Sequence, residues 1–150
     1  SMFRLELLKG GGLPTAELIS LVNLIKPKEL PAFGISNQGT RIRRLRYLND
    51  IAVALEEIWL DSEAGILNIE DLNDSIYHVY KNKLGIWISR VEDRVSIKSV
   101  PQWSPIKFRV PIKTKTGFVE RFGWAASKYP IEYSRTWFDC DKAHYVQRLK

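Results

Sequence analysis

Apolar and polar residues alternate along several stretches of the chain, and this two-residue period is typical of β-strands. The strands predicted in this way are Met2–Leu8, Thr40–Leu48, Val53–Leu60, Ile86–Val100, Gly117–Ala126, Ile131–Phe138 and Ala143–Leu149. Asn49-Asp50 lies between two of these strands, and such residues favour a tight turn. We therefore expect Thr40–Leu48 and Val53–Leu60 to pair as an antiparallel hairpin.

Two other stretches have a helical spacing of apolar residues. In the first, which opens at Pro14 and is ended by Pro27 and Pro31, the apolar residues are Leu18, Leu21, Val22 and Ile25. The second runs from Leu72 to Leu84, and Gly85 ends it. Asp61–Leu67 is expected to be a loop, and the prolines at 101, 105 and 111 indicate an irregular link. The predicted fold is a single α+β domain over residues 1–150, mainly an antiparallel sheet with flanking helices.

Composition agrees with a soluble domain and limits its partners. The 150 residues include 23 Lys and Arg against 17 Asp and Glu, for a net charge of +6. The dense basic run, however, sends Arg41 and Arg43 to one face of a strand and Arg44 and Arg46 to the other, which disfavours a continuous nucleic-acid-binding stripe. No membrane span or signal peptide is expected, and Ser1 before Met2 is typical of an expression scar.

Other residue types point to no cofactor or metal. The single cysteine, Cys140, excludes an intramolecular disulfide and agrees with a reducing cytoplasm. His78 and His144 have no partners at metal-ligand spacing. The five tryptophans lie mostly in predicted strands and are expected in the core.

The strand Val53–Leu60 carries one carboxylate on each otherwise apolar face, Glu56 and Glu57. Ionised carboxylates are rarely buried without compensation. On the neighbouring strand, Arg44 and Arg46 share one face and could either pair with a glutamate or bind an anionic ligand. The spacing leaves both alternatives open, and it does not decide which glutamate faces a ligand.

Two further polar residues have alternative explanations. Ser75 lies at the start of the Leu72–Leu84 helix, where a hydroxyl caps the helix or contributes to an anion site. Glu132 shares a strand face with Ser134, Thr136 and Phe138, which suits either solvent exposure or recognition of ligand hydroxyls.

Three sequence blocks in this order resemble the UTRA domain (UbiC transcription regulator-associated), the effector-binding module of GntR-family, HutC-type bacterial repressors. The blocks are Arg41–Asp50 running into Ala54–Leu60, the segment Asp71–Tyr77, and Pro130–Ser134 through Asp141. The resemblance implies a chorismate-lyase-like fold and a homodimer that senses a small anionic metabolite. Its implied ligand-binding residues are Arg44, Arg46, Glu56, Ser75, Tyr77, Glu132 and Phe138, the last standing where relatives often have a tyrosine.

The resemblance also implies that DNA is contacted by a winged-helix domain, which is absent from this chain and would ordinarily precede Met2. The sequence therefore favours a cytoplasmic effector-binding domain of a transcriptional regulator, without catalytic residues. The alternative is a chorismate-lyase-like enzyme, since both classes use an arginine-lined pocket for an anion.

Overall fold

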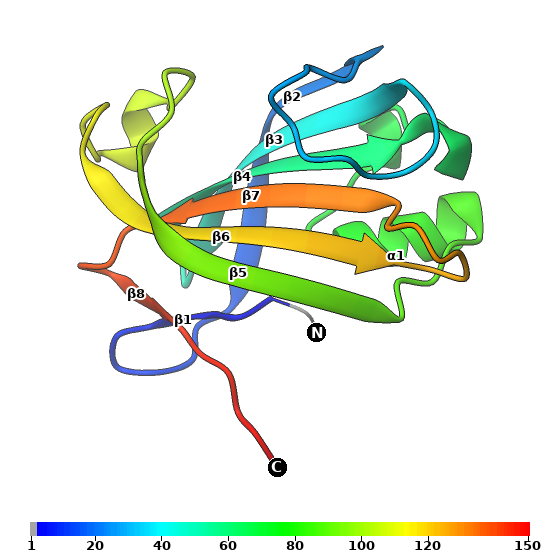
Figure 1. Cartoon of the computed structure of the whole chain (residues 1–150). Coiled ribbons are helices and arrows are strands. Elements are labelled where there is room, and N and C mark those ends of the chain that lie inside the picture. The colour runs from blue at the N-terminus through cyan, green and yellow to red at the C-terminus, as the bar shows by residue number, and fades with distance from the viewer. Residues whose placement is uncertain (1–2) are drawn as a thin grey trace.

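A six-stranded antiparallel sheet forms the centre of the computed structural model, which describes residues 3–150 (Figure 1). Ser1 and Met2, and with them the suggested expression scar and the start of the first predicted strand, lie outside the described residues. The strand order is β2-β3-β4-β7-β6-β5. These strands are β2 (Pro14–Ile25), β3 (Gln38–Leu48), β4 (Ile51–Asp61), β5 (Arg90–Ser99), β6 (Lys115–Trp124) and β7 (Glu132–Phe138).

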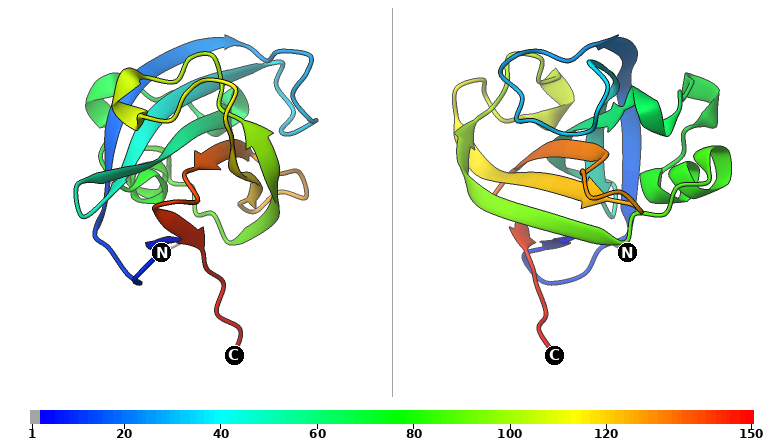
Figure 2. Two further views of the ribbon diagram at one scale, coloured as in Figure 1. Left: turned by 90° about the vertical axis from the view of Figure 1, so that its left-hand side faces the viewer. Right: turned by 45° about the vertical axis from the view of Figure 1, so that its right-hand side comes forward.

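A second, two-stranded sheet closes one end of the large sheet. It pairs β1 (Leu5–Leu7) with β8 (Ala143–Tyr145), which brings the two ends of the described chain together. The large sheet is strongly curved between its edge strands β2 and β5 (Figure 2). The α+β fold with a mainly antiparallel sheet is thus confirmed, although its helical part is small.

The predicted hairpin is present. β3 and β4 pair from Gly39 with Asp61 to Leu48 with Ile51. Asn49 and Asp50 both have positive φ, 49° and 63°, as a two-residue turn of this kind requires. The turn sets the pairing of Leu48 with Ile51, and a register shift between Arg46 and Tyr47 then places Arg44 opposite Glu56.

The helix predicted after Pro14 is wrong, because Pro14–Ile25 is the edge strand β2. A β-bulge lies between Leu18 and Ser20, and Leu18 is paired with Arg44 whereas Leu21 is paired with Ile42. The extra residue of the bulge places Leu18 and Leu21 on the same face although they are three residues apart. A bulged strand can thus reproduce a helical spacing of apolar residues.

The second predicted helix is present but shorter. The α-helix α1 (Ile76–Val79) continues as the π-helical turn η3 (Tyr80–Leu84), and Gly85 ends it with φ of 67°. The residues before Ile76 form the 3-10 turn η2 (Ile69–Asp71) and a short extended segment. Within residues 3–150, no helix has the length and apolar character needed to cross a membrane.

The remaining predictions are right in kind but not in extent. The strand expected at Ile86 begins at Arg90, and the one expected to reach Leu149 ends at Tyr145. The Asp61–Leu67 loop holds the 3-10 turn η1 (Ser62–Ala64), and the proline-rich link holds η4 (Ile106–Phe108). The helical region packs against one face of the sheet, through a cluster that includes Ile42, Ile58, Val79 and Tyr80. η4 packs on the opposite face, against Leu45, Leu55 and Trp137.

Candidate functional site: a polar cavity between the sheet and the helical region

The two adjacent glutamates of β4 point to opposite faces of the sheet. Glu56 lies beside Arg44 and Arg46, whereas Glu57 lies beside Arg43 and Arg135. Arg44 Nε donates to Glu56 Oε1 over 2.9 Å, and Arg46 Nη1 donates to the two carboxylate oxygens over 3.2 and 3.3 Å. Both carboxylates are therefore compensated by arginines, and Glu56 also lines a cavity.

Glu56 and its two arginines form a group with a net positive charge. Burial alone would raise the pKa of Glu56, but Arg44 and Arg46 outweigh it and lower this pKa to about 2. The carboxylate is therefore ionised at neutral pH and cancels one of the two arginine charges. Arg44 and Arg46 are only 2% and 5% exposed, so the remaining charge lies almost fully out of solvent.

Arg44 also contacts the chain that leads into α1. Its Nη1 donates to the carbonyl oxygens of Asn73 and Asp74 over 3.2 and 3.3 Å. Its Nη2 lies 2.7 Å from Glu56 Oε1 but makes no well-aligned hydrogen bond within residues 3–150, although it is buried. This nitrogen therefore keeps donor capacity for a further acceptor.

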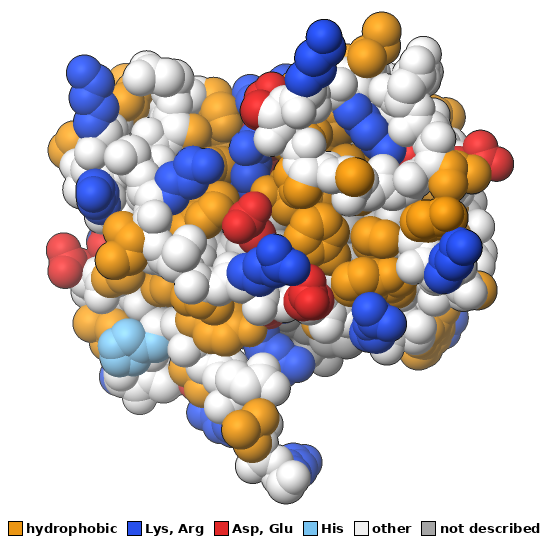
Figure 3. Space-filling view, in the orientation of Figure 1, with side chains coloured by type: hydrophobic (Ala, Val, Ile, Leu, Met, Phe, Trp, Pro, Cys, Tyr) orange, Lys and Arg blue, Asp and Glu red, His pale blue; other side chains and the backbone are white. Residues whose placement is uncertain are grey.

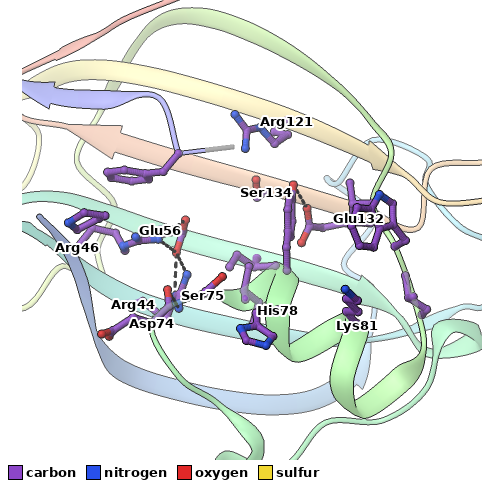
Figure 4. Close-up of a pocket in the computed structure, with 18 of the residues that line it drawn as sticks. Arg44, Arg46, Glu56, Asp74, Ser75, His78, Lys81, Arg121, Glu132 and Ser134 are labelled. Carbon is purple, nitrogen blue, oxygen red and sulfur yellow. Dashed lines mark hydrogen bonds and ion pairs between the residues drawn. The ribbon is translucent and has the colours of Figure 1, made fainter. Parts of the chain in front are cut away.

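Ser75 occupies the N-cap position of α1, but its hydroxyl makes no capping hydrogen bond. Instead, its backbone N–H donates to Asn73 Oδ1 over 2.9 Å, and its side chain lines the cavity beside Asp74. The capping explanation of Ser75 is therefore wrong for its hydroxyl. The position next to Arg44 is compatible with a role in anion binding (Figure 4).

Glu132 lies at another side of the cavity, where two tyrosines of the helical region hold it. Tyr77 and Tyr80 donate their hydroxyls to Oε1 and Oε2 over 2.9 and 2.5 Å. Glu132 is 1% exposed, and burial raises its pKa although both tyrosine hydroxyls act to lower it. This carboxyl is thus a buried polar group of the site and not part of a solvated sheet face.

Phe138 is the predicted site residue that the structure places elsewhere. Ala54 pairs with Arg46 on one side and with Phe138 on the other, so Phe138 lies on the same sheet face as Arg46. The β1–β8 sheet covers this end, however, and Phe138 packs with Leu5 and Ala143 at 6% exposure. Phe138 therefore lies in the core outside the cavity lining, while all the other predicted site residues line the cavity.

Several lining residues were not anticipated from the sequence. They are Asp74, His78, Lys81, Trp87 and Arg121. Ser134, which the sequence already places on the strand face of Glu132, also lines the cavity. Arg121 could not be found from the sequence, because its position depends on the pairing of β6 with β7. Trp87 corrects the expectation of a core tryptophan, since it is 63% exposed and lies 4.7 Å under the Lys81 ammonium.

Together these residues surround a cavity of about 740 Å³, within the range of metabolite-binding sites. Its polar groups come from β3, β4, β6, β7 and the residues at α1, while Ile58, Ile76 and Ile88 supply apolar wall.

The face of the molecule opposite α1 shows acidic, basic and apolar side chains interspersed, and not a continuous basic surface (Figure 3). Among residues 3–150, no group of three or more His, Cys, Asp and Glu side chains could hold a metal ion.

The fold is similar to that of several solved bacterial proteins. One is the ligand-binding domain of a protein assigned to the GntR family of transcriptional regulators, from Bordetella bronchiseptica. It matches with a TM-score of 0.84 at 18% identity, over 100% of this chain and 98% of that chain. Another is PhnF from Mycobacterium smegmatis, with a TM-score of 0.75 at 15% identity, over 91% of this chain and 63% of that chain.

The family is identified by sequence. The UTRA domain family model matches residues 9–144, and the chain belongs to this family. It is also 44% identical over 151 residues to the HTH-type transcriptional regulator SmoD of Agrobacterium fabrum (strain C58 / ATCC 33970). That match covers 100% of this chain and 64% of SmoD, so the chain spans less than two thirds of this relative.

Proposed function

We propose that this chain is the effector-binding domain of a GntR-family, HutC-type transcriptional regulator that acts in the cytoplasm. The effector is a small anionic metabolite, namely a sugar phosphate, a phosphonate or a carboxylate, bound in the cavity. Arg44, Arg46 and Ser75 bind the anionic group, and Glu56, Tyr77 and Glu132 contact the rest of the ligand. Contact with DNA is assigned to a winged-helix region outside these 150 residues.

The observation that carries this proposal is the buried, incompletely compensated arginine pair. Two guanidiniums share one carboxylate, and one buried nitrogen, Arg44 Nη2, has no well-aligned acceptor within residues 3–150. A buried cation is unfavourable unless a counter-charge and hydrogen bonds compensate it. A phosphate, phosphonate or carboxylate oxygen would supply both.

The geometry favours recognition over catalysis. A carboxyl with a pKa of about 2, as in Glu56, has no proton to donate at neutral pH. Both oxygens of Glu132 already accept hydrogen bonds from tyrosines. Arg44 links the ligand region to the carbonyls before α1, so an effector bound there can favour one arrangement of this segment. Allosteric couplings between two binding sites are typically about 1–3 kcal/mol.

A matched pair of variants tests the anion site. Arg46→Ala removes the excess charge on the cavity side and leaves Glu56 paired with Arg44. Arg43→Ala makes the equivalent change on the opposite face, where Glu57 keeps Arg135. We expect inorganic phosphate and sugar phosphates to raise the melting temperature of the wild type and of Arg43→Ala, but not of Arg46→Ala. A ligand bound at 100 times its Kd stabilises by about 2.7 kcal/mol, or about 5–10 °C at this size.

The control variant decides between local and general effects of charge. If Arg46→Ala keeps the full response, or if Arg43→Ala loses it equally, the cavity is not the anion site.

A homodimer is the second part of the proposal. Both edge strands of the large sheet expose apolar side chains, including Ile25 on β2 at 65% and Ile97 on β5 at 71%. Exposed apolar edges are typical of surfaces that another chain covers. Sedimentation equilibrium should therefore give twice the chain mass of 17.4 kDa. A mass of one chain throughout the micromolar range would contradict the dimer.

A further inference from the structure

The cavity has a second arginine, Arg121, whose surroundings differ from those of Arg44 and Arg46. It comes from β6 and lies across the cavity from Arg44 and Asp74 (Figure 4). Within the sheet, Arg121 pairs with Asp93 of β5 on one side and with Ser134 of β7 on the other. These residues therefore form one cross-strand row on the cavity face.

Asp93 fixes the orientation of the Arg121 guanidinium. Arg121 Nε and Nη2 donate to the two oxygens of Asp93 over 2.6 and 2.9 Å. Tyr145 of β8 also donates to Asp93, over 2.5 Å, so this carboxylate is held from two elements. A side-on bidentate pair leaves the third nitrogen, Nη1, on the far side of the guanidinium. The guanidinium also interacts with the Tyr77 hydroxyl, which places it beside Glu132.

The two arginine regions differ in charge. Arg44, Arg46 and Glu56 sum to one positive charge, whereas Arg121 and Asp93 sum to zero. The charge of Arg4 acts on the same Asp93 carboxylate. Around Arg121, the side chains of Ser134, Tyr77 and Glu132 add hydroxyl and carboxyl groups to the cavity wall. Such a mixture of donors and acceptors matches neutral hydroxyl or carbonyl oxygens, because a second anion would lie next to the Glu132 carboxyl.

We propose that Arg121 is a specificity-determining residue that binds a neutral oxygen of the effector, at the end opposite the anionic group. The effector then has a single acidic group, bound at Arg44 and Arg46, and hydroxyl or carbonyl oxygens that contact Arg121. The backbones of β3 and β6 are three strand spacings apart, or about 14 Å. After the arginine side chains have filled part of this distance, the remaining space suits a single sugar-sized molecule. This inference rests on the proposed function.

The test compares three probes on the wild type, namely inorganic phosphate, fructose 6-phosphate and fructose 1,6-bisphosphate. Phosphate can occupy only the Arg44 and Arg46 end, so it reports on the proposed function alone. We expect fructose 6-phosphate to bind at least about 10-fold more tightly than phosphate and also more tightly than the bisphosphate.

Two variants assign these differences to Arg121. In Arg121→Met, fructose 6-phosphate should bind about 10-fold more weakly, while phosphate affinity stays the same. In Asp93→Asn, the Arg121 region gains a positive charge, so the preference should move toward the bisphosphate. Arg94→Ala is the control, because it removes an arginine of β5 whose side chain is 67% exposed.

The possible failures are distinguishable. If phosphate stabilises the wild type no more than it stabilises the Arg46→Ala variant, the proposed function itself fails. If phosphate binds but fructose 6-phosphate binds no better, or if Arg121→Met leaves its affinity unchanged, the role of Arg121 is wrong. Tighter wild-type binding of the bisphosphate would overturn the charge argument. If Asp93→Asn does not fold, the Arg121→Met result decides.

Discussion

At the scale of single residues, the neighbours Glu56 and Glu57 show how one strand serves two purposes. Because side chains alternate along a strand, adjacent glutamates reach opposite faces, and each meets a different arginine pair. On the Glu57 side, Trp59 Nε1 also donates to the carboxylate, and Arg43 lies against Trp103, so that side is packed. Glu56 also pairs with two arginines, but these three residues line the cavity, where their net positive charge is available to bind an anion.

The Glu56 carboxylate should make stability depend on pH. Its pKa in the folded chain is about 2, below its ordinary value of 4.5. Since folding lowers this pKa, the contribution is fully present above about pH 4.5 and is lost as the pH falls toward 2. We expect Glu56→Gln to lower the free energy of unfolding by about 3 kcal/mol at pH 7, and by progressively less in acid.

Urea unfolding between pH 7 and pH 2.5 measures this difference. The exposed Glu92, paired with Arg94 on β5, supplies the control Glu92→Gln, which should change stability by less than about 0.5 kcal/mol. A Glu56→Gln difference that stays constant down to pH 2.5 would show that Arg44 and Arg46 do not lower the pKa of Glu56.

At the scale of elements, Glu132 connects the helical region to the sheet. The α1 and η3 residues Tyr77 and Tyr80 both donate to this buried carboxyl of β7. Removing one donor leaves a buried acceptor with fewer partners, and such losses cost about 1–3 kcal/mol. We therefore expect Tyr80→Phe to destabilise the fold by this amount and to speed amide hydrogen exchange in residues 76–84.

Hydrogen exchange with mass spectrometry checks both parts of this prediction. Tyr129→Phe, at a tyrosine that is 48% exposed, is the matched control and should leave the exchange of residues 76–84 unchanged. Unaltered protection of the helical region in Tyr80→Phe would show that its hydroxyl does not hold it to the sheet.

Elements also show where sequence reasoning succeeds. The β3–β4 hairpin was predictable because alternation and the Asn49-Asp50 turn agree. β2 was not, because its bulge changes a period of two into a spacing of three. The start of α1 was misplaced by the apolar Leu72, which lies outside the helix and packs against the cluster around Val79 and Tyr80.

At the scale of the whole molecule, the site depends on strand order, which one sequence does not reveal. Arg44, Arg46 and Glu56 were predictable because they lie on one hairpin. Arg121 joins them only because β7 inserts between β4 and β6. Phe138 was included because it shares the correct face, and it is excluded because β1 and β8 pair over that end of the sheet. Long-range pairing thus decides which part of a sheet face remains open.

The central claim is that the cavity arginines bind the anionic group of the effector. NMR of the arginine Nε–H groups during a phosphate titration tests this most directly, because it observes each guanidinium separately. We expect saturable shifts at Arg44 and Arg46, and unchanged signals at Arg43 and Arg135 on the opposite face. Saturable shifts at Arg43 and Arg135, with none at Arg44 and Arg46, would contradict it.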